Sequence, residues 1–129
     1  MALTAFTSRL GRGQGRLATP KATGGDYAFV LGDDEQGRLF ELAPGDHAEV
    51  TQETDLTSVM LVRALLRLRV PASTPTGLAW EASIIVDGAK LAAMRATPGR
   101  ERRATDLAAN VSKLSGLHII GVRLELVVA

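Results

Sequence analysis

The sequence LAWEASIIVDGAKLAAMRA, residues 78–96, contains two short apolar runs separated by a turn dipeptide. In the first run the even positions are apolar, while the odd positions include Glu81 and Ser83, which is the period-two pattern of a strand with one face in a core. Asp87 and Gly88 follow, and both residue types tolerate the positive φ that a type I′ turn requires. The stretch therefore predicts an antiparallel hairpin, with strands at residues 78–86 and 89–96.

Residues 59–70, VMLVRALLRLRV, carry the longest alternation in the chain. Every even position from 60 to 70 is apolar, and the arginines are all at odd positions: Arg63, Arg67 and Arg69. A helix is the competing interpretation, because Ala64, Leu65 and Leu66 favour it, but a helix would scatter the three arginines. We predict a strand that Pro71 ends.

The acidic region before this strand contains three further short apolar runs with turn residues between them. Loops of three to five residues that contain glycine commonly join antiparallel strands, and DDEQG (33–37) is of this kind. The predicted strands are residues 27–31, 38–42 and 47–52.

The C-terminal residues 105–129 change period partway. Asp106 suits a helix N-cap, and Gly116 suits the left-handed stop. Leu107, Val111 and Leu114 share one helical face between them, which predicts a short helix over 106–115. From 120 to 128 the even positions are apolar and His118 falls on the same face, which predicts a long core strand over 118–128.

These elements predict an all-β protein, an antiparallel β-sandwich with one short helix and an extended N-terminal arm. The sequences WEASIIVDG (80–88) and TDLAANVSKLSGLHIIGVRLEL (105–126) resemble the closing half of jelly-roll modules of the carbohydrate-binding and galactose-binding-like type. The resemblance covers residues 78–128 and implies a jelly-roll-like sandwich, as in accessory proteins of phage virions. We expect a shared core made of Leu66, Leu68, Trp80, Ile84, Ile120, Leu124 and Leu126.

The composition predicts one domain and a separate arm. With 129 residues, of which 46% are hydrophobic, the chain can bury one real core. We assign residues 26–129 to the sandwich and residues 1–25 to an extended basic arm whose glycines oppose independent folding. The chain has no cysteine for disulfides or thiolate ligands, no run of about 18 uncharged apolar residues that would span a bilayer, and no recognisable secretory signal, so we expect synthesis in a cytoplasm.

Charge is distributed in blocks along the sequence. Residues 1–25 carry four bases and no acid, whereas residues 26–56 carry nine acids and one base. Such blocks are compatible either with solvated faces or with association between oppositely charged surfaces.

Candidate catalytic and ligand-binding residues are few. His47 and His118 are the two histidines, and neither stands in a triad, nucleophile-elbow or zinc-ligand context. GRGQG (11–15) lacks the strand and the Gly-Lys-Ser/Thr of a phosphate loop, and the acidic loop at 33–35 lacks the ligand alternation of a calcium loop. We expect no catalytic residue, no cofactor and no metal.

Binding of sugars or nucleic acid is poorly supported by the aromatic content, which is 4%. Trp80 lies on the apolar phase of its strand, so we expect it in the core, which leaves Tyr27 almost alone as a stacking platform. Nucleic acid is therefore not an expected partner, and a carbohydrate- or surface-binding module is the alternative function.

The leading expectation is a non-enzymatic structural protein of a phage virion, a capsid decoration or tail component, assembled in the host cytoplasm. Its partners would be other copies of itself or a major capsid or tail protein, reached through the arm. Arm residues would dock by apolar contact and charge on acids of a neighbouring copy. The predicted partner-binding residues are Leu3, Phe6, Arg9, Leu10, Arg12, Arg16, Leu17, Asp33, Asp34 and Glu35.

Overall fold

The computed structural model describes residues 7–12, 16–17, 21–23, 26–28, 31–32, 44–45, 47–66, 74, 76–97 and 105–129, and before residue 44 it describes the backbone alone. Every regular element in this part of the chain is a β-strand, so the expected all-β class is confirmed. The strands that form the core are β6 (His47–Asp55), β7 (Leu61–Leu66), β8 (Leu78–Val86), β9 (Ala89–Ala96), β10 (Thr105–Asn110) and β11 (Leu117–Val128). The shorter strands before them are β1 (Thr7–Arg12), β2 (Arg16–Leu17), β3 (Lys21–Thr23), β4 (Asp26–Ala28) and β5 (Leu31–Gly32).

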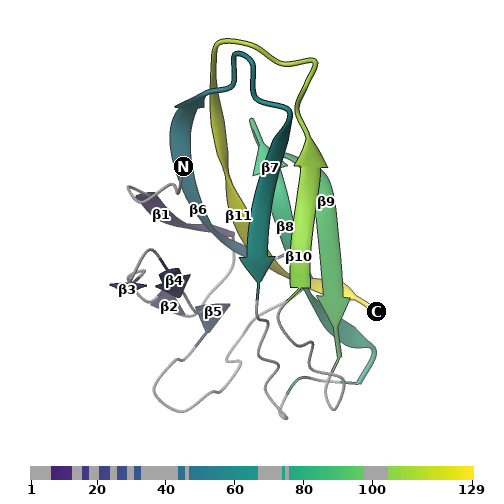
Figure 1. The fold of residues 1–129 in the computed structure, drawn as a ribbon. Helices are drawn as coiled ribbons and strands as arrows, with labels where there is room; N and C mark the ends of the chain where they lie inside the picture. Colours follow the sequence, from purple (N-terminus) through teal and green to yellow (C-terminus); the bar gives the residue numbers. More distant parts are fainter. Residues whose placement is uncertain are drawn as a thin grey trace.

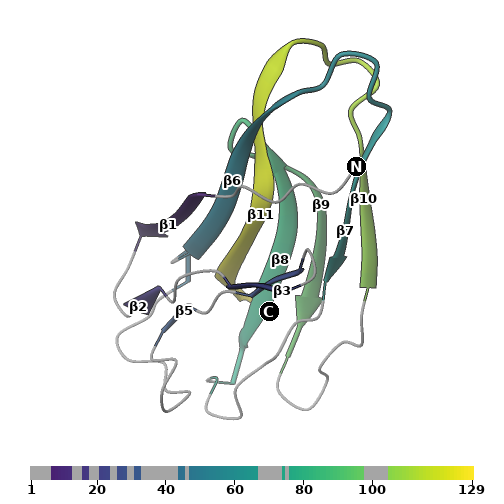
Figure 2. The ribbon, with the colours of Figure 1, turned by 60° about the vertical axis from the view of Figure 1, so that its left-hand side comes forward.

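Two antiparallel sheets pack against each other. The large sheet has the strand order β1-β6-β11-β8-β9, and the small sheet pairs β10 with β7. Figures 1 and 2 both show β7 and β10 as a layer separate from the large sheet. The pairs β6–β11, β7–β10 and β8–β9 are nested along the chain, because each pair encloses the next one in sequence.

The hairpin of β8 and β9 has the predicted turn. Asp87 has φ 51° and Gly88 has φ 82°, so both residues occupy the left-handed region that a type I′ turn requires. Two positions into β9 the register shifts, because Ile85 faces Lys90 while Ile84 faces Ala92. Leu91 therefore has no partner on β8, which is the arrangement of a β-bulge.

The core lies between the two sheets and contains two clusters of buried side chains. The first cluster surrounds Trp80, which is 2% exposed; its other buried members are Ala82, Met94, Ala96 and Leu126, and Leu66, Leu78, Leu107 and Leu124 pack against them. The second consists of Leu56, Val86, Val111 and Ile120, with Val59, Val62 and Leu114 packed against them.

Most of the expected core is confirmed. Trp80, Ile84, Ile120 and Leu126 are fully buried. Leu66 and Leu124 are only half-buried, and Ile120 belongs to the second cluster rather than to the one around Trp80. Leu68 lies outside the described residues.

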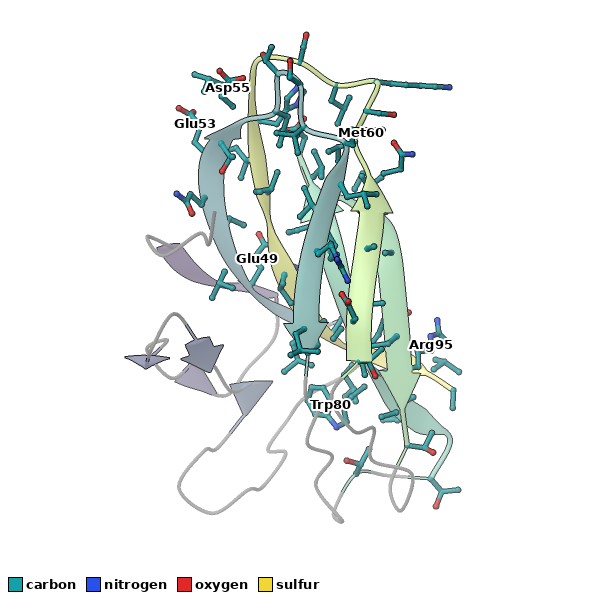
Figure 3. All side chains as sticks on the ribbon, in the orientation of Figure 1. Glu49, Glu53, Asp55, Met60, Trp80 and Arg95 are labelled. Carbon is teal, nitrogen blue, oxygen red and sulfur yellow. The ribbon has the colours of Figure 1, made fainter. Side chains whose placement is uncertain are left out.

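The strand predicted over 59–70 is confirmed for Leu61–Leu66, where even positions are half-buried and odd positions are exposed. Met60 was expected on the core face, but it is 69% exposed. Met60 follows a turn closed by a hydrogen bond from the Val59 N–H to the Leu56 carbonyl at 3.0 Å, and the strand with its alternation begins only at Leu61. Residues 67–70 lie outside the described part of the chain. Figure 3 labels Met60 at the end of the molecule opposite Trp80.

The helix predicted over 106–115 is wrong, because residues 105–110 form β10. This strand pairs antiparallel with β7 over its whole length, from Thr105 opposite Leu66 to Asn110 opposite Leu61. Asp106, the expected helix cap, instead forms an ion pair with Arg63 on β7. Two helical turns are marginal on their own, so a full set of ladder bonds to β7 prevails over the helical spacing.

The N-terminal strands only partly follow the predicted pattern. The strand predicted at 47–52 is confirmed as β6 and extends to Asp55. In place of one strand at 27–31, the chain forms β4, which pairs with β3, and β5, which pairs with β2. The predicted loop 33–37 and strand 38–42 lie outside the described residues.

The strand expected at 118–128 is confirmed as β11, which is held between β6 and β8 in the middle of the large sheet. At its centre the backbones approach closely, because a Cβ on Gly121 would lie 1.9 Å from the Val50 carbonyl oxygen of β6. Only glycine fits this position without moving one strand from the other.

Candidate functional site

The charged residues of the large sheet line up across its outer face, which we define as the face turned away from the small sheet. Strand alternation places them opposite the core residues Trp80 and Leu126. One row runs from His47 through Glu125 and Glu81 to Arg95, because these residues face one another across β6, β11, β8 and β9. The neighbouring row contains Glu49, Arg123, Ser83 and Ala93.

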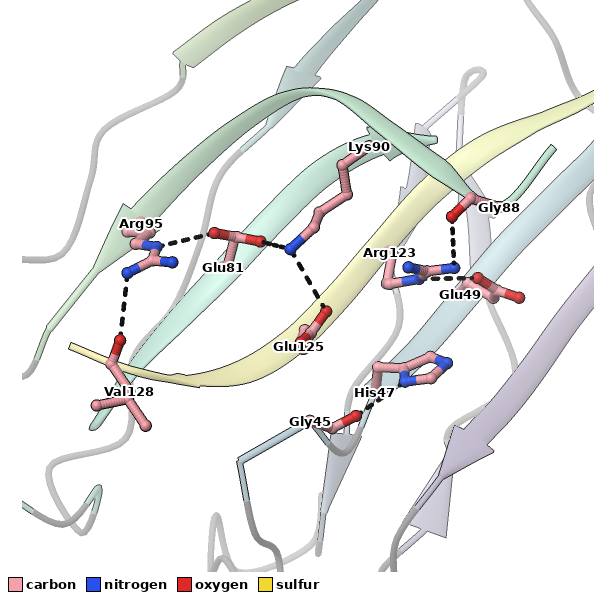
Figure 4. A network of polar contacts seen from close by, with 10 residues as sticks. All are labelled: Gly45, His47, Glu49, Glu81, Gly88, Lys90, Arg95, Arg123, Glu125 and Val128. Atoms are coloured by element: carbon pink, nitrogen blue, oxygen red, sulfur yellow. Dashed lines mark hydrogen bonds and ion pairs between the residues drawn. The ribbon is translucent and has the colours of Figure 1, made fainter. Parts of the chain in front are cut away.

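Glu81 is the centre of the first row and is only 4% exposed. Its carboxylate accepts hydrogen bonds from Lys90 Nζ at 2.7 Å and from Arg95 Nε at 2.8 Å (Figure 4). Lys90 Nζ also lies 3.9 Å from Glu125, and Arg95 Nη1 donates to the Val128 carbonyl at 3.2 Å. The two cations therefore tie β9 to β8 and to the end of β11.

The ionisation of Glu81 follows from these contacts. Burial of the carboxyl raises its pKa, but the hydrogen bonds and charges of Lys90 and Arg95 outweigh burial, so the pKa of Glu81 lies below its ordinary value. Glu81 is thus a fixed anion. A general acid or base at neutral pH would instead have a pKa close to the working pH, so this carboxylate is suited to structure rather than to proton transfer.

The second row joins β11 to β6. Arg123 Nε donates to Glu49 at 3.1 Å, and Arg123 Nη2 donates to the Gly88 carbonyl in the β8–β9 turn at 3.3 Å. The Glu49 side chain is 5% exposed and that of Arg123 is 16% exposed. Arg123 thereby connects the turn at one side of the large sheet with the acid of β6 at the other.

The side of β6 away from β11 is occupied by the arm. β1 pairs antiparallel with β6, with Thr7 opposite Thr51, Arg9 opposite Glu49 and Arg12 opposite His47. The register is regular from Thr7 to Leu10 and shifts before Arg12. The basic arm thus meets the acidic region at Glu49, a position that the sequence did not single out.

The predicted partner-binding residues are distributed over three places. Arg9, Leu10 and Arg12 lie on β1. Arg16 and Leu17 form β2 and face Gly32 and Leu31 of β5. The remaining ones, Leu3, Phe6, Asp33, Asp34 and Glu35, lie outside the described residues, so the predicted contact of the arm with residues 33–35 stays a prediction.

At the opposite side of the large sheet, β9 presents a different edge. It carries the bulge at Leu91 and the two cations of the Glu81 network, Lys90 and Arg95. β10 of the small sheet packs beside it. Charged side chains, a bulge and a covering strand are three features that hinder the addition of another strand.

Both histidines have structural hydrogen bonds. His118 Nδ1 lies 2.6 Å from Asp87 Oδ2, and Nε2 lies 3.0 Å from the Ser115 carbonyl. The hydrogen bonds to Asp87 and Ser115 raise the pKa of His118, while the hydrogen bonds from His118 and from the Ile119 N–H lower the pKa of Asp87. His47 begins β6, in agreement with the strand predicted at 47–52, and its Nδ1 lies 3.0 Å from the Gly45 carbonyl. No serine hydroxyl or second carboxylate is hydrogen-bonded to either ring among the described residues.

Trp80 has the core position that the sequence predicted. Its indole Nε1 donates to Thr74 Oγ1 at 3.1 Å, so the one polar atom of this buried side chain is satisfied. Trp80 is therefore not a stacking platform for a sugar. The part of the chain that the structure describes has no cluster of three or more His, Cys, Asp or Glu side chains that could hold a metal ion. In the same residues no helix is long and apolar enough to cross a bilayer.

Sequence reasoning missed the residues of the two charged rows. The alternation of residues 78–86 and 118–128 places Glu81, Arg123 and Glu125 on the face opposite the core, and that signal was visible. The pairing of β11 with both β6 and β8 was not, since strand neighbours are set by topology rather than by local pattern.

Comparison with known proteins finds no matching family model, no matching curated protein and no matching solved structure.

Proposed function

We propose that this chain is a non-enzymatic structural protein of a repeating assembly, and that it docks through its N-terminal arm. The leading case is a virion, with the protein as a capsid decoration or tail component. Its partners are other copies of the same chain or a major capsid or tail protein. The proposal is supported by the way in which the arm binds to the rest of the molecule.

The observation that carries the proposal is that the arm is bound as an edge strand, through backbone pairing with β6. β1 pairs with β6 along the edge of the large sheet. An element that binds through backbone pairing along a sheet edge can leave that edge and add to the same edge of another copy.

The nested strand pairs support the finer description of the fold as a jelly-roll-like sandwich. In a chain folded this way, a long hairpin is wound so that its outer, middle and inner strand pairs are β6–β11, β7–β10 and β8–β9. Jelly rolls recur in viral capsid and lectin domains. Because one fold serves many functions, this likeness supports the virion proposal only alongside the arm geometry.

The charge distribution also favours docking by the arm. The arm has four bases and no acid, and its first strand lies opposite Glu49 of β6. An opposite-charge pair across two strands contributes about 0.2–1 kcal/mol, so charge selects the site and backbone pairing supplies most of the binding. Assembly should then depend only partly on salt.

Removal of β1 tests the proposed function. We expect the chain without residues 2–12 to keep the far-UV circular dichroism of a folded β protein but to remain monomeric in sedimentation velocity, at concentrations where the full chain forms oligomers. A matched control replaces Arg9, Arg12 and Arg16 by glutamine, which keeps the backbone and should weaken assembly only in part. Equal oligomerisation of the truncated and full chains would contradict docking through the arm, and a full chain that is monomeric at every concentration would contradict docking on other copies of the same chain.

A further inference from the structure

We propose that the β6 edge of one copy accepts β1 of a second copy, so that exchanged N-terminal strands link neighbouring chains. This inference rests on the proposed function, and it adds the acceptor and the mode of docking. The acceptor is the β6 segment from His47 to Thr51, and the occupant is Thr7–Arg12 of another copy of this chain.

The acceptor is a stable platform whether or not β1 is present. β6 pairs with β11 at nine positions on one side, from Leu117 opposite Asp55 to Glu125 opposite His47, and with β1 at five positions on the other. Glu49 is anchored to β11 through Arg123. β6 therefore keeps its place in the sheet when β1 leaves, and its outer backbone N–H and C=O groups become available to another strand.

Exchange between identical chains preserves the contacts of this edge. The incoming strand has the same sequence, so the same five register positions form, with Arg9 again opposite Glu49. Protein concentration decides whether β1 pairs with β6 of its own chain or of another copy. The chain's own β1 is tethered to β6 and so competes with the β1 of other copies at an effective concentration in the millimolar range. In dilute solution β1 closes on its own sheet, and in a dense array of copies the arm of a neighbour competes with it.

The β9 edge is a poor alternative acceptor. Its register shift leaves Leu91 unpaired on β8, and Lys90 and Arg95 place two cations there. A basic arm would meet like charges at this edge, whereas at β6 it meets the acid Glu49. The difference selects one edge of the large sheet for strand addition.

Disulfide trapping tests the exchange directly, because the chain has no cysteine of its own. Thr7 and Thr51 face each other across β1 and β6. Residues directly opposite in an antiparallel pair have Cα atoms about 4.5–5.5 Å apart, within the range that a disulfide bridges. One full-length chain carries Thr7→Cys, and a second, isotope-labelled chain carries Thr51→Cys. They are mixed, oxidised and measured by intact mass spectrometry.

We expect a disulfide-linked heterodimer whose yield rises with protein concentration. The double variant Thr7→Cys/Thr51→Cys in one chain should close within the monomer when dilute. Ala93→Cys replaces Thr51→Cys as the matched control, because Ala93 is exposed on the β9 edge, and it should give no concentration-dependent heterodimer with Thr7→Cys.

Mixed single variants that stay monomeric at every concentration, while the double variant closes, would overturn the exchange. A double variant that fails to close would overturn it too, because β1 would then not pair with Thr51. Equal heterodimer yields with Ala93→Cys would show that the β6 edge is not selected, which also overturns it. Loss of assembly on deletion of residues 2–12 without any heterodimer would leave the proposed function standing and remove only the exchange.

Discussion

The two edges of the large sheet differ in what they offer to another strand. On one side β6 carries β1 in a register that is regular from Thr7 to Leu10. On the other side β9 has an unpaired residue at Leu91, two cations and a covering strand, β10. Edge strands invite pairing unless charge, bulges or cover prevent it. The comparison indicates that the large sheet is open to strand addition at one edge and protected at the other.

We expect the largest loss of stability from a substitution between β11 and β6, the strand that accepts β1. Gly121→Val adds a side chain whose Cβ would lie 1.9 Å from the Val50 carbonyl oxygen, so β11 and β6 must separate. We expect the free energy of unfolding to fall by about 3 kcal/mol or more, at the upper end for overpacked sites, measured by urea denaturation.

Ala93→Val is the matched control at the protected edge, because Ala93 is exposed on β9. It should change the free energy of unfolding by no more than about 0.5 kcal/mol. Equal effects of the two valines would mean that β6 and β11 do not approach closely at Gly121.

A smaller loss of stability is expected when a cation is removed from one of the two buried glutamates, Glu49 on β6 or Glu81 on β8, which lies beside β9. Arg123→Met removes a hydrogen bond to Glu49 between side chains that are 16% and 5% exposed, so we expect the free energy of unfolding to fall by about 2 kcal/mol, within the range for hydrogen bonds to charged groups. Lys90→Met removes one partner of Glu81, but Arg95 remains and Lys90 is 41% exposed, so solvent screening should keep the loss below about 1 kcal/mol. Chemical denaturation of both variants gives the comparison, and a larger loss for Lys90→Met would contradict the argument from solvent screening.

The smallest expected effect concerns pH. His118 and Asp87 join the start of β11 to the turn of the protected edge. The pKa of His118 is raised in the folded state by its hydrogen bonds to Asp87 and Ser115, so the stabilisation it contributes is complete below its unfolded pKa, about 6.5, and is lost as pH rises through the folded pKa. The pKa of Asp87 is lowered, so its contribution is present above about 3.9 and is lost as pH falls through the folded pKa.

The difference in Tm between the protein and its His118→Gln variant should therefore be largest between about pH 4 and 6.5 and shrink above that window. The imidazole of His118, followed by NMR, should titrate above its ordinary midpoint and return toward it in Asp87→Asn. A Tm difference that stays constant from acid to alkaline pH would exclude the ion pair as its cause.

The sequence predicted the parts of the fold that depend on local chemistry. Asp87 and Gly88 predicted a type I′ turn because few pairs of successive residues tolerate positive φ at both positions, and the structure has that turn. The alternation of residues 78–86 and 118–128 likewise identified two strands of the large sheet. In these cases the prediction depends only on the backbone preference of each residue or on whether its side chain is apolar or polar.

Residues 105–110 were misread because Leu107, Val111 and Leu114 match a helical face, although only Leu107 of the three lies on β10. These residues form a strand because they pair with β7, which lies about forty residues earlier in the chain. The hydrogen bonds to β7 and the Arg63–Asp106 ion pair cannot be predicted from the sequence around residues 105–110 alone. The charged rows were missed for the same reason, because Glu81 and Glu49 acquire their partners only when β8, β9, β11 and β6 are set side by side. Strand order was the missing information in both cases.

The central claim is that the β6 edge accepts the N-terminal strand, and complementation in trans tests it most directly. A peptide with the sequence of residues 2–13 is added to the chain without residues 2–12, and amide shifts are followed by NMR. The account predicts saturable binding that shifts residues 47–51 and leaves 89–96 unchanged. A peptide with proline at both Ser8 and Arg9 should not bind, because successive N–H groups point to opposite sides and one of the two must face β6. Shifts centred on β9, or no binding of the unaltered peptide, would contradict the claim.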